Sequence, residues 1–320
     1  MSRNINLNAA KRAKNDEFYT QLSDIEKEMK HYRDHFKDKV IFCNCDDPKW
    51  SNFWYYFDSN FEYLGLKKLI STHFDPEKDV SYKLATYIGE SGIKITTEEP
   101  IYGDEDYPPG DFRSNDCVEL LKEADIVVTN PPFSLFGEYV AQLIKHNKKF
   151  LILGNQNAIT YKETFPLLKD NKMWLGYCNG SHEFKVPKDY STGTLRIDEA
   201  GEKYAKLGNI CWYTNLDLKK RHEDLILYKT YKGNEKDYPK YDNYDAINVN
   251  KVSEIPMDYD GAMGVPITFL DKYNPSQFEI LGIDSSFAKP VFVNKKMKKV
   301  HRFYINDKQL YARILIKKSP

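Results

Sequence analysis

A chain of 320 residues with 41% hydrophobic content is long enough for one large α/β domain with an appendage, or for two domains, and can bury a sizeable core. Its five cysteines are an odd number without a Cys-x-x-Cys pair, which argues against a disulfide framework and a zinc site, and we expect no metal. No apolar run approaches membrane-spanning length and the amino terminus lacks an apolar signal region, so we expect a cytoplasmic protein without a membrane partner.

Charge is balanced over the whole chain but not along it. The 47 basic residues match 47 acidic ones, which by itself gives no support to nucleic-acid binding. Between residues 289 and 320, however, ten Lys or Arg stand against one acid, Asp307. A solvated basic tail is one explanation, but apolar triplets at 291–293, 303–305 and 314–316 favour folded strands that carry the charge. We therefore predict a phosphate-facing surface whose candidates are Lys295, Lys296, Lys298, Lys299, Arg302 and Arg313.

The first patterned segment is 15–20, Asn-Asp-Glu-Phe-Tyr-Thr, which precedes a helix with Leu22, Ile25 and Met29 on one face. Either Thr20 or Ser23 could cap this helix. Free N–H groups at a helix start bind anions such as a carboxylate, so Thr20 and its neighbours are ligand candidates. An ordinary helix cap is the alternative.

The first central strand is predicted at 39–43, followed by the loop Asn44-Cys-Asp-Asp-Pro48. In a wound α/β sheet this loop is where a nucleoside binds. It has no glycine-rich fingerprint, and Asp46 and Asp47 would repel a phosphate, which disfavours NAD and ATP. A hydrated acidic turn is the alternative.

Helices and strands continue to alternate beyond this loop. We predict a helix with an aromatic side at 51–57, a second strand at 66–72, a strand pair around Gly89 to Gly92, and a surface loop over the acidic segment 98–111. A ribose contact would need an acid soon after the second strand, where the sequence has Thr72-His-Phe-Asp75. Asp111 precedes an amphipathic helix through residues 118–124 and could accept an adenine amino group, with Phe112 beside the ring. An acid at a helix start is the structural alternative.

The segment Asp125-Ile-Val-Val-Thr129 has the β-branched density of a buried strand. Asn130-Pro131-Pro132-Phe133 follows it with a rigid turn that cannot continue the sheet. Because ligands bind at the carboxyl ends of strands in an open α/β sheet, Asn130 and Phe133 would face a ligand from a stiff mount. A Pro-Pro turn that merely ends a core strand is the alternative.

These residue types suit the alkylation of an exocyclic amine on a planar base. If the Asn130 side-chain carbonyl and the Pro131 backbone carbonyl each accept a hydrogen from an NH2 group, its lone pair becomes less conjugated and points at an electrophile. Phe133 would stack on the ring. No side-chain nucleophile is needed, because the substrate nitrogen attacks the sulfonium methyl of S-adenosylmethionine directly. This cofactor carries an ammonium and a sulfonium but no phosphate, which fits the acidic loop at Asp46 and Asp47.

The alternation of strands and helices to about residue 154 predicts an α/β fold with a Rossmann-like, doubly wound sheet, to which 173–176 and 209–214 add further strands. From 219 to 260 the chain is polar and rich in tyrosine and turns. We place a boundary near 218. Residues 1–218 would form the S-adenosylmethionine-dependent methyltransferase domain, and 219–320 an appended C-terminal target-recognition and DNA-binding region, helped by a loop at 179–185.

Taken in order, these segments resemble the EcoRI-type family of DNA adenine-N6 methyltransferases. The resemblance rests on Asp-Glu-Phe-Tyr-Thr at 16–20, the first strand with its acidic loop, Gly-Asp-Phe at 110–112 and the strand ending in Asn-Pro-Pro-Phe, and it extends to 264–274 and 311–316. It implies that Asn130, Pro131, Pro132 and Phe133 grip a flipped adenine. The cofactor contacts that we infer with it are Phe18, Tyr19, Thr20, Cys43, Asn44, Asp46, Asp47, Thr72, Asp111, Phe112 and Asn130.

The resemblance also implies double-stranded DNA as the partner, with a target base that leaves the stack at a cost of about a few kcal/mol. The protein would belong to a restriction-modification system, or be an orphan methylase, and act as a monomer or weak dimer. A cognate restriction endonuclease would share its site without forming a stable complex. Base contacts could come from Arg221, Asn234, Asn243, Gln277 or Arg302.

Three other functions stay open: methylation of RNA adenine, methylation of a protein glutamine, and a non-catalytic DNA-binding subunit with the same fold. The basic carboxyl-terminal region favours nucleic acid over a protein tail as the substrate. The intact Asn130–Phe133 segment speaks against a decayed pocket.

Overall fold

The computed structural model describes residues 19–187, 190–191, 194–293, 296–298 and 300–319, and it describes no side chain between 292 and 299. Two compact units make up the fold. The first comprises the chain up to residue 158 together with 175–216, and the second comprises 159–174 and the chain from 217 onwards. The fold is mixed α/β with one large sheet, which confirms the predicted class at this level.

The first unit is built on an eleven-stranded sheet. Its main path runs in the order β1 (Tyr19–Thr20), β9 (Gly180–Lys185), β11 (Lys203–Thr214), β7 (Lys149–Asn155), β6 (Ile126–Thr129), β2 (Val40–Cys43), β3 (Lys68–Thr72), β4 (Ser81–Ile88) and β5 (Lys94–Ile101). In addition, β8 (Trp174–Leu175) and β10 (Thr194–Ile197) pair with β11. The central strands β7, β6, β2 and β3 are parallel, and antiparallel strands continue the sheet on both sides. Parallel strands are usually covered on both faces, and β2 and β6 are accordingly buried along their whole length.

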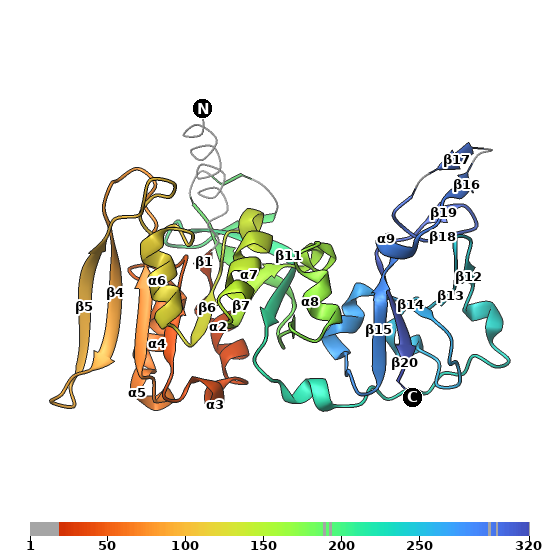
Figure 1. Ribbon diagram of the computed structural model, residues 1–320, viewed down its shortest axis with the longest axis horizontal. Helices are drawn as coiled ribbons and strands as arrows, with labels where there is room; N and C mark the ends of the chain where they lie inside the picture. The colour runs from red at the N-terminus through yellow and green to blue at the C-terminus, as the bar shows by residue number, and fades with distance from the viewer. Residues whose placement is uncertain (1–18, 188–189, 192–193, 294–295, 299, 320) are drawn as a thin grey trace. The chain divides into compact units, whose positions relative to one another are not determined.

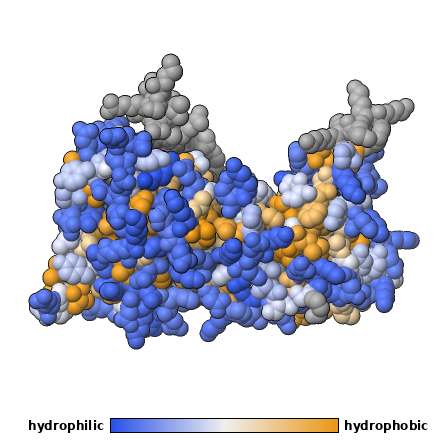
Figure 2. Space-filling model, in the orientation of Figure 1, coloured by the Kyte–Doolittle hydropathy of each residue, from blue (hydrophilic) through white to orange (hydrophobic). Residues whose placement is uncertain are grey.

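Helices connect these strands. They are α2 (Leu22–Met29), α3 (Arg33–Phe36), α4 (Asn52–Ser59), α5 (Phe61–Leu64), α6 (Asn115–Glu123) and α7 (Phe136–Lys145). Serine side chains cap two of them: the hydroxyl of Ser51 accepts from the Phe53 N–H at 3.0 Å, and Ser114 accepts from the Cys117 N–H at 3.4 Å. The surface over α6 and α7 is mainly hydrophilic (Figure 2), as expected for helices that turn one apolar side inwards.

Three local predictions are wrong. The residue that precedes α2 is Gln21, and neither Thr20 nor Ser23 caps it; Thr20 instead pairs with Phe184 of β9. The segment from Glu98 to Ile101 belongs to β5, which forms a long hairpin with β4 at the sheet edge (Figure 1). The predicted loop at 179–185 is mostly strand β9, because β1 and β11 supply hydrogen-bonding partners on its two sides.

The second unit contains a five-stranded sheet in the order β12 (Lys240–Tyr241), β13 (Tyr244–Asn248), β14 (Met263–Pro266), β20 (Arg313–Lys318) and β15 (Phe278–Ile283). Two small hairpins accompany it, β16 (Val291–Val293) with β17 (Lys296–Lys298), and β18 (Tyr304–Ile305) with β19 (Lys308–Gln309). Short helices α8 (Phe165–Lys169) and α9 (Asp284–Phe287) complete it. The predicted folding of the basic region into strands is therefore confirmed.

Within the described ranges, no helix combines the length and the apolar character needed to cross a membrane.

Candidate active site

Three neighbouring strands end at the same edge of the first sheet. β2 lies between β3 and β6, all three are parallel, and their last residues are Cys43, Thr72 and Thr129. The chain order reverses here, because β3 follows β2 on one side whereas β6 comes later on the other. Such a switch point is where an open α/β sheet binds its ligand. The predicted cofactor loop 44–48 and the predicted base-gripping segment 130–133 therefore meet at this edge.

Asp46 joins these two loops. Its Oδ2 accepts a hydrogen bond from the backbone N–H of Asn130 at 3.3 Å and from the Thr129 hydroxyl, and its Oδ1 accepts from the Ser51 hydroxyl at 3.1 Å. The Thr129 hydroxyl also contacts the Asn44 carbonyl oxygen. The start of the Asn-Pro-Pro-Phe segment is thus fixed to the loop after β2 by a carboxylate rather than by apolar packing alone.

The loop after β2 turns without glycine because Cys45 adopts the left-handed region, with a φ of 67°. The Asn44 side chain stabilises this turn: its Oδ1 accepts from the Cys45 N–H at 2.9 Å and from the Thr72 hydroxyl at 3.2 Å. Asn44 is buried, and so are Cys43 and Thr72. These three predicted cofactor residues therefore stabilise the shape of the loop. Any contact with a ligand would come from other, exposed atoms of the loop.

The electrostatics of the loop favour a cation. Burial raises the pKa of Asp46 to about 7, although hydrogen bonds from Thr129, Asn130 and Ser51 lower it. Burial also raises the pKa of Asp47, but hydrogen bonds from His73, the Lys49 N–H and Tyr82 outweigh this and leave it below its usual value. A positively charged ligand beside these carboxylates would stabilise their ionised forms.

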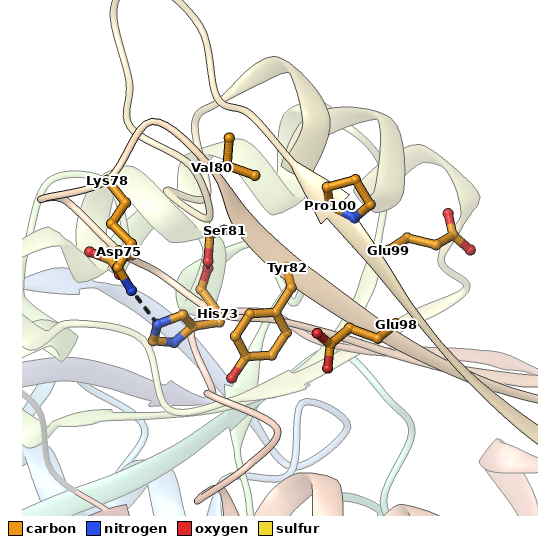
Figure 3. A pocket seen from close by; sticks show the side chains of 9 residues that line it. All are labelled: His73, Asp75, Lys78, Val80, Ser81, Tyr82, Glu98, Glu99 and Pro100. Carbon is orange, nitrogen blue, oxygen red and sulfur yellow. Dashed lines mark hydrogen bonds and ion pairs between the residues drawn. The ribbon is translucent and has the colours of Figure 1, made fainter.

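A cavity of about 320 Å³ opens beside the carboxyl end of β3 (Figure 3). Its wall includes His73, Asp75 and Tyr82, with the acids Glu98 and Glu99 on the β5 side. Two of its wall residues contact the acidic loop: Nδ1 of His73 lies 3.0 Å from the Asp47 carboxylate, and the Tyr82 hydroxyl donates to that carboxylate at 2.8 Å. Asp75, the acid after the second strand in the sequence, therefore lines this cavity, with its carboxylate 2.9 Å from Nζ of Lys78.

Thr20, the last residue of the amino-terminal motif, contacts the start of α4, whose capping residue Ser51 also bonds to Asp46. Thr20 is buried, and its backbone carbonyl accepts a 2.7 Å hydrogen bond from the Asn52 amide at the start of α4. Its hydroxyl oxygen is buried without a hydrogen-bond partner in the described part of the chain. An orphaned donor of this kind suits a bound polar ligand. Tyr19 precedes it in β1, and Phe18 lies outside the described residues.

The carboxylate of Asp111 is paired with Arg113, two residues further along the chain. Arg113 donates from Nε to Oδ1 at 2.9 Å and from Nη2 to Oδ2 at 2.8 Å, a bidentate pair that the sequence reasoning missed. Phe112 is buried and makes an edge contact with Tyr139, with ring centroids 4.9 Å apart. A ligand amino group at Asp111 would share the carboxylate with Arg113, and Phe112 offers no exposed face.

The Asn-Pro-Pro-Phe segment leaves β6 as predicted. Asn130, Pro132 and Phe133 are half-buried, Pro131 is buried, and Phe133 begins a short 3₁₀ turn. The rings of Phe133 and of Phe184 on β9 form a T-shaped pair, with centroids 6.5 Å apart and planes at 86°. Ser51, Asn52 and Phe184 lie at this candidate site, and the sequence reasoning did not select them. Only Ser51 had a local signal, since it stands at the start of the helix pattern predicted at 51–57.

The structure separates the basic candidates. Arg313 is buried, and its Nε donates to the Asn248 side chain at 3.1 Å, so a direct phosphate contact by Arg313 is not supported. Arg302 is half-buried and pairs with the fully buried Asp284 at 3.1 Å. Lys296 and Lys298 belong to β17, whereas Lys295 and Lys299 lie outside the described residues.

Most of the predicted base-reading side chains have partners inside the second unit. The Arg221 guanidinium lies 3.6 Å from the centroid of the Trp174 ring. Gln277 donates to the Leu225 carbonyl and accepts from its N–H, and Asn243 donates to the carbonyls of Lys289 and Arg302. Asn234 is exposed and donates to Thr230. Of these five side chains, Asn234 is exposed, Gln277 and Arg302 are half-buried, and Arg221 and Asn243 are buried.

Comparisons with known proteins show which family the sequence of this chain matches. The family model described as adenine-specific methyltransferase EcoRI matches residues 6–319. The chain is 51% identical to the type II methyltransferase M.EcoRI of Escherichia coli, over 97% of this chain and 95% of that protein. It is 42% identical to M.MgeORF184P of Mycoplasma genitalium, over 98% of both chains, and 44% identical to M.MpnI of Mycoplasma pneumoniae, over 86% of this chain and 84% of that one. No solved structure matches.

Proposed function

Since this chain belongs to the EcoRI family of adenine-specific methyltransferases, it is a site-specific DNA adenine methyltransferase, and we propose that it transfers the methyl of S-adenosylmethionine to N6 of an adenine flipped out of duplex DNA. The observation that carries this proposal is the junction at Asp46. One carboxylate ties the loop suited to a cationic cofactor to the segment suited to an amino group.

In the proposed mechanism, Asn130 and Pro131 act on the nucleophile. The target amino group donates one hydrogen to Oδ1 of Asn130 and the other to the Pro131 carbonyl, which directs its lone pair away from the ring. Phe133 stacks on the base and Pro132 keeps the turn rigid. Asp46 holds the Asn130 backbone by its N–H and thereby limits the freedom of the whole segment.

S-adenosylmethionine supplies an electrophilic methyl when it is bound. The residues present fit this molecule, because the Asp46 and Asp47 carboxylates complement its positive groups and the orphaned Thr20 hydroxyl can donate to its carboxylate. The cavity beside β3 gives room for polar contacts next to the same loop. Tyr19, Asn44, Asp111 and the remaining cofactor candidates complete the proposed set, with Cys43, Phe112 and Thr72 in supporting positions.

In this proposal, one region of the chain carries out methyl transfer and the other recognises the DNA. The parallel strands of the first unit would form the Rossmann-like core, with the methyltransferase domain ending near 218. The second region would recognise the target sequence and bind the DNA phosphates. A monomer would then methylate one strand at a time, with a cognate endonuclease reading the same sequence independently.

Substitution of Asn130 tests the proposed chemistry. We expect Asn130→Ala to lower the single-turnover rate on DNA by about 100-fold or more, the usual loss when one preorganised transition-state partner is removed. Binding of S-adenosylhomocysteine, measured by calorimetry, should stay near the wild-type value. Asn130→Asp keeps an acceptor oxygen at this position and should retain more activity than the alanine variant.

Asn60→Ala is the matched control, because that amide donates to the Tyr56 carbonyl in a helix away from the loops. Its rate should equal that of the wild type. Full activity of Asn130→Ala would contradict the assigned role, and loss of cofactor binding would show that the substitution disturbs the fold instead.

A further inference from the structure

Helix α2 carries a carboxylate that the proposed chemistry does not use. Glu28 is fully buried, and three donors surround it: the Tyr32 hydroxyl at 2.7 Å, the Tyr177 N–H at 2.8 Å and the Cys178 N–H at 2.7 Å. A buried carboxylate is costly unless it is fully hydrogen-bonded, and it rarely adds stability over an apolar side chain of the same size. The hydrogen bonds that Glu28 accepts therefore serve mainly to hold the segment 176–179 in one conformation.

The residues around Glu28 are adapted to this contact. A Cβ at Gly176 would lie 2.3 Å from Oε1 of Glu28 and 2.6 Å from Cβ of Trp212, so a glycine is required for the carboxylate to approach. The Asn179 side chain donates to the Gly176 carbonyl at 2.7 Å and accepts from the Trp212 N–H at 2.9 Å. The His31 ring stacks on Tyr177 with centroids 3.8 Å apart.

A second anchor lies on β9 itself. The buried His182 places Nδ1 3.2 Å from the Asp24 carboxylate and Nε2 3.1 Å from the Cys178 carbonyl oxygen. The ring thus bridges Asp24 on α2 and the backbone just before β9. The hydrogen bond from His182 accordingly lowers the pKa of Asp24, while burial acts in the opposite direction.

Two residues further along β9, Phe184 meets Phe133. Phe184 is fully buried, pairs across the sheet with Thr20 and Ala205, and presents its ring to that of Phe133 at 86°. Edge-to-face pairs of this geometry are favourable and restrict ring orientation. Glu28 and Asp24 on α2 are thus connected, through β9 and its residue Phe184, to the ring of Phe133.

We propose that Glu28 and the Asp24–His182 pair are positioning residues that fix β9, so that Phe184 holds the Phe133 ring in the orientation that receives the target base. This inference rests on the proposed function, since Phe133 is the ring on which the base would stack. Phe184 acts through Phe133 and is itself a positioning residue.

A double-mutant cycle on Phe184 and Phe133 tests whether the first ring orients the second. Phe184→Leu keeps an apolar side chain but removes the ring edge, and we expect it to lower the single-turnover rate on duplex DNA about tenfold, within the usual coupling between residues in contact. Phe133→Leu should lower the rate at least as much. The double variant should be no slower than Phe133→Leu alone, because Phe184 has nothing left to orient.

Phe57→Leu is the matched control, since Phe57 is equally buried and meets Phe36 edge-to-face at 5.2 Å. It should lower the melting temperature like Phe184→Leu but leave the rate unchanged in either background. Effects of Phe184→Leu and Phe133→Leu that multiply, or an unchanged rate in Phe184→Leu, would overturn the inference.

His182→Gln in the Phe133→Leu background repeats the comparison if Phe184→Leu does not fold, with the same expected absence of a further loss. A wild-type protein that leaves DNA adenine unmodified would overturn the proposed function and this inference together. An active wild type with multiplying effects would overturn only the inference.

Discussion

At the scale of single residues, Asp46 differs from the role that its sequence context suggests. An acidic loop predicts attraction of a cation, whereas the structure also gives this carboxylate three donors from the protein, one of them the Asn130 N–H. Burial disfavours the ionised form of Asp46 and so raises the pKa of its carboxyl to about 7. Because this carboxylate also accepts from the Asn130 N–H, we expect its protonation to affect the proposed transfer.

Asp46→Asn should therefore separate activity from stability. A carboxyl with a raised pKa takes up a proton on folding between its unfolded pKa of about 4 and its folded pKa of about 7, so its charge costs stability above pH 7 and not at low pH. We expect Asp46→Asn to melt no lower than the wild type at pH 8, with this advantage shrinking towards pH 5. Its transfer rate should be low at every pH.

Wild-type activity should fall as the pH drops through about 7, because protonated Asp46 no longer offers a carboxylate to the Asn130 N–H. Rate profiles and thermal unfolding between pH 5 and 9 measure both effects, with the exposed Asp170→Asn as control. A normal rate in Asp46→Asn would show that the carboxylate neither positions Asn130 nor assists the cofactor.

The sequence predicts the reacting segment but not its support. Asn130 to Phe133 stand out because a buried β-branched run and two prolines are local features. The contacts of Asp46 with Thr129 and Asn130, and of Phe133 with Phe184, join residues far apart in the chain, and a single sequence carries no signal for them. The Asp111–Arg113 pair spans only two residues, yet its bidentate geometry depends on the turn before α6.

At the scale of elements, strands and helices with strong periodicity follow the prediction. The failures occur where pairing overrides local composition. Polar segments 98–101 and 180–185 become strands because β4, β1 and β11 provide backbone partners, although their side chains resemble those of loops. The start of α2 is displaced for the same reason, since strand β1 takes up Thr20.

The hairpin of β16 and β17 is the element on which the phosphate-binding prediction now depends. Substituting Lys296 and Lys298 by Gln should weaken DNA binding and flatten its dependence on salt, by about 0.9 in slope for each phosphate that is no longer neutralised. Fluorescence anisotropy across a salt series measures this slope. Lys240→Gln with Lys251→Gln is the control, because each of those lysines pairs with an acid of its own, Asp245 and Glu254. If the two double variants have equal slopes, the hairpin of β16 and β17 does not contact the DNA phosphates.

At the scale of the whole molecule, the two compact units are not two consecutive pieces of chain. Residues 159–174 join the second unit although they precede β9 and β11 of the first. A composition shift near 218 cannot reveal such an excursion, because it depends on packing and not on local sequence. The balanced total charge is equally uninformative, since it hides the excess of ten basic residues over one acid between 289 and 320.

The proposed function is tested most directly by incubating the wild-type protein with unmethylated genomic DNA and labelled S-adenosylmethionine, and then mapping every modified base. We expect N6-methyladenine at one short, defined sequence and no label in RNA or protein added to the same reaction. Label on another base, on RNA or on protein, or no transfer at all from an intact, cofactor-binding protein, would contradict it.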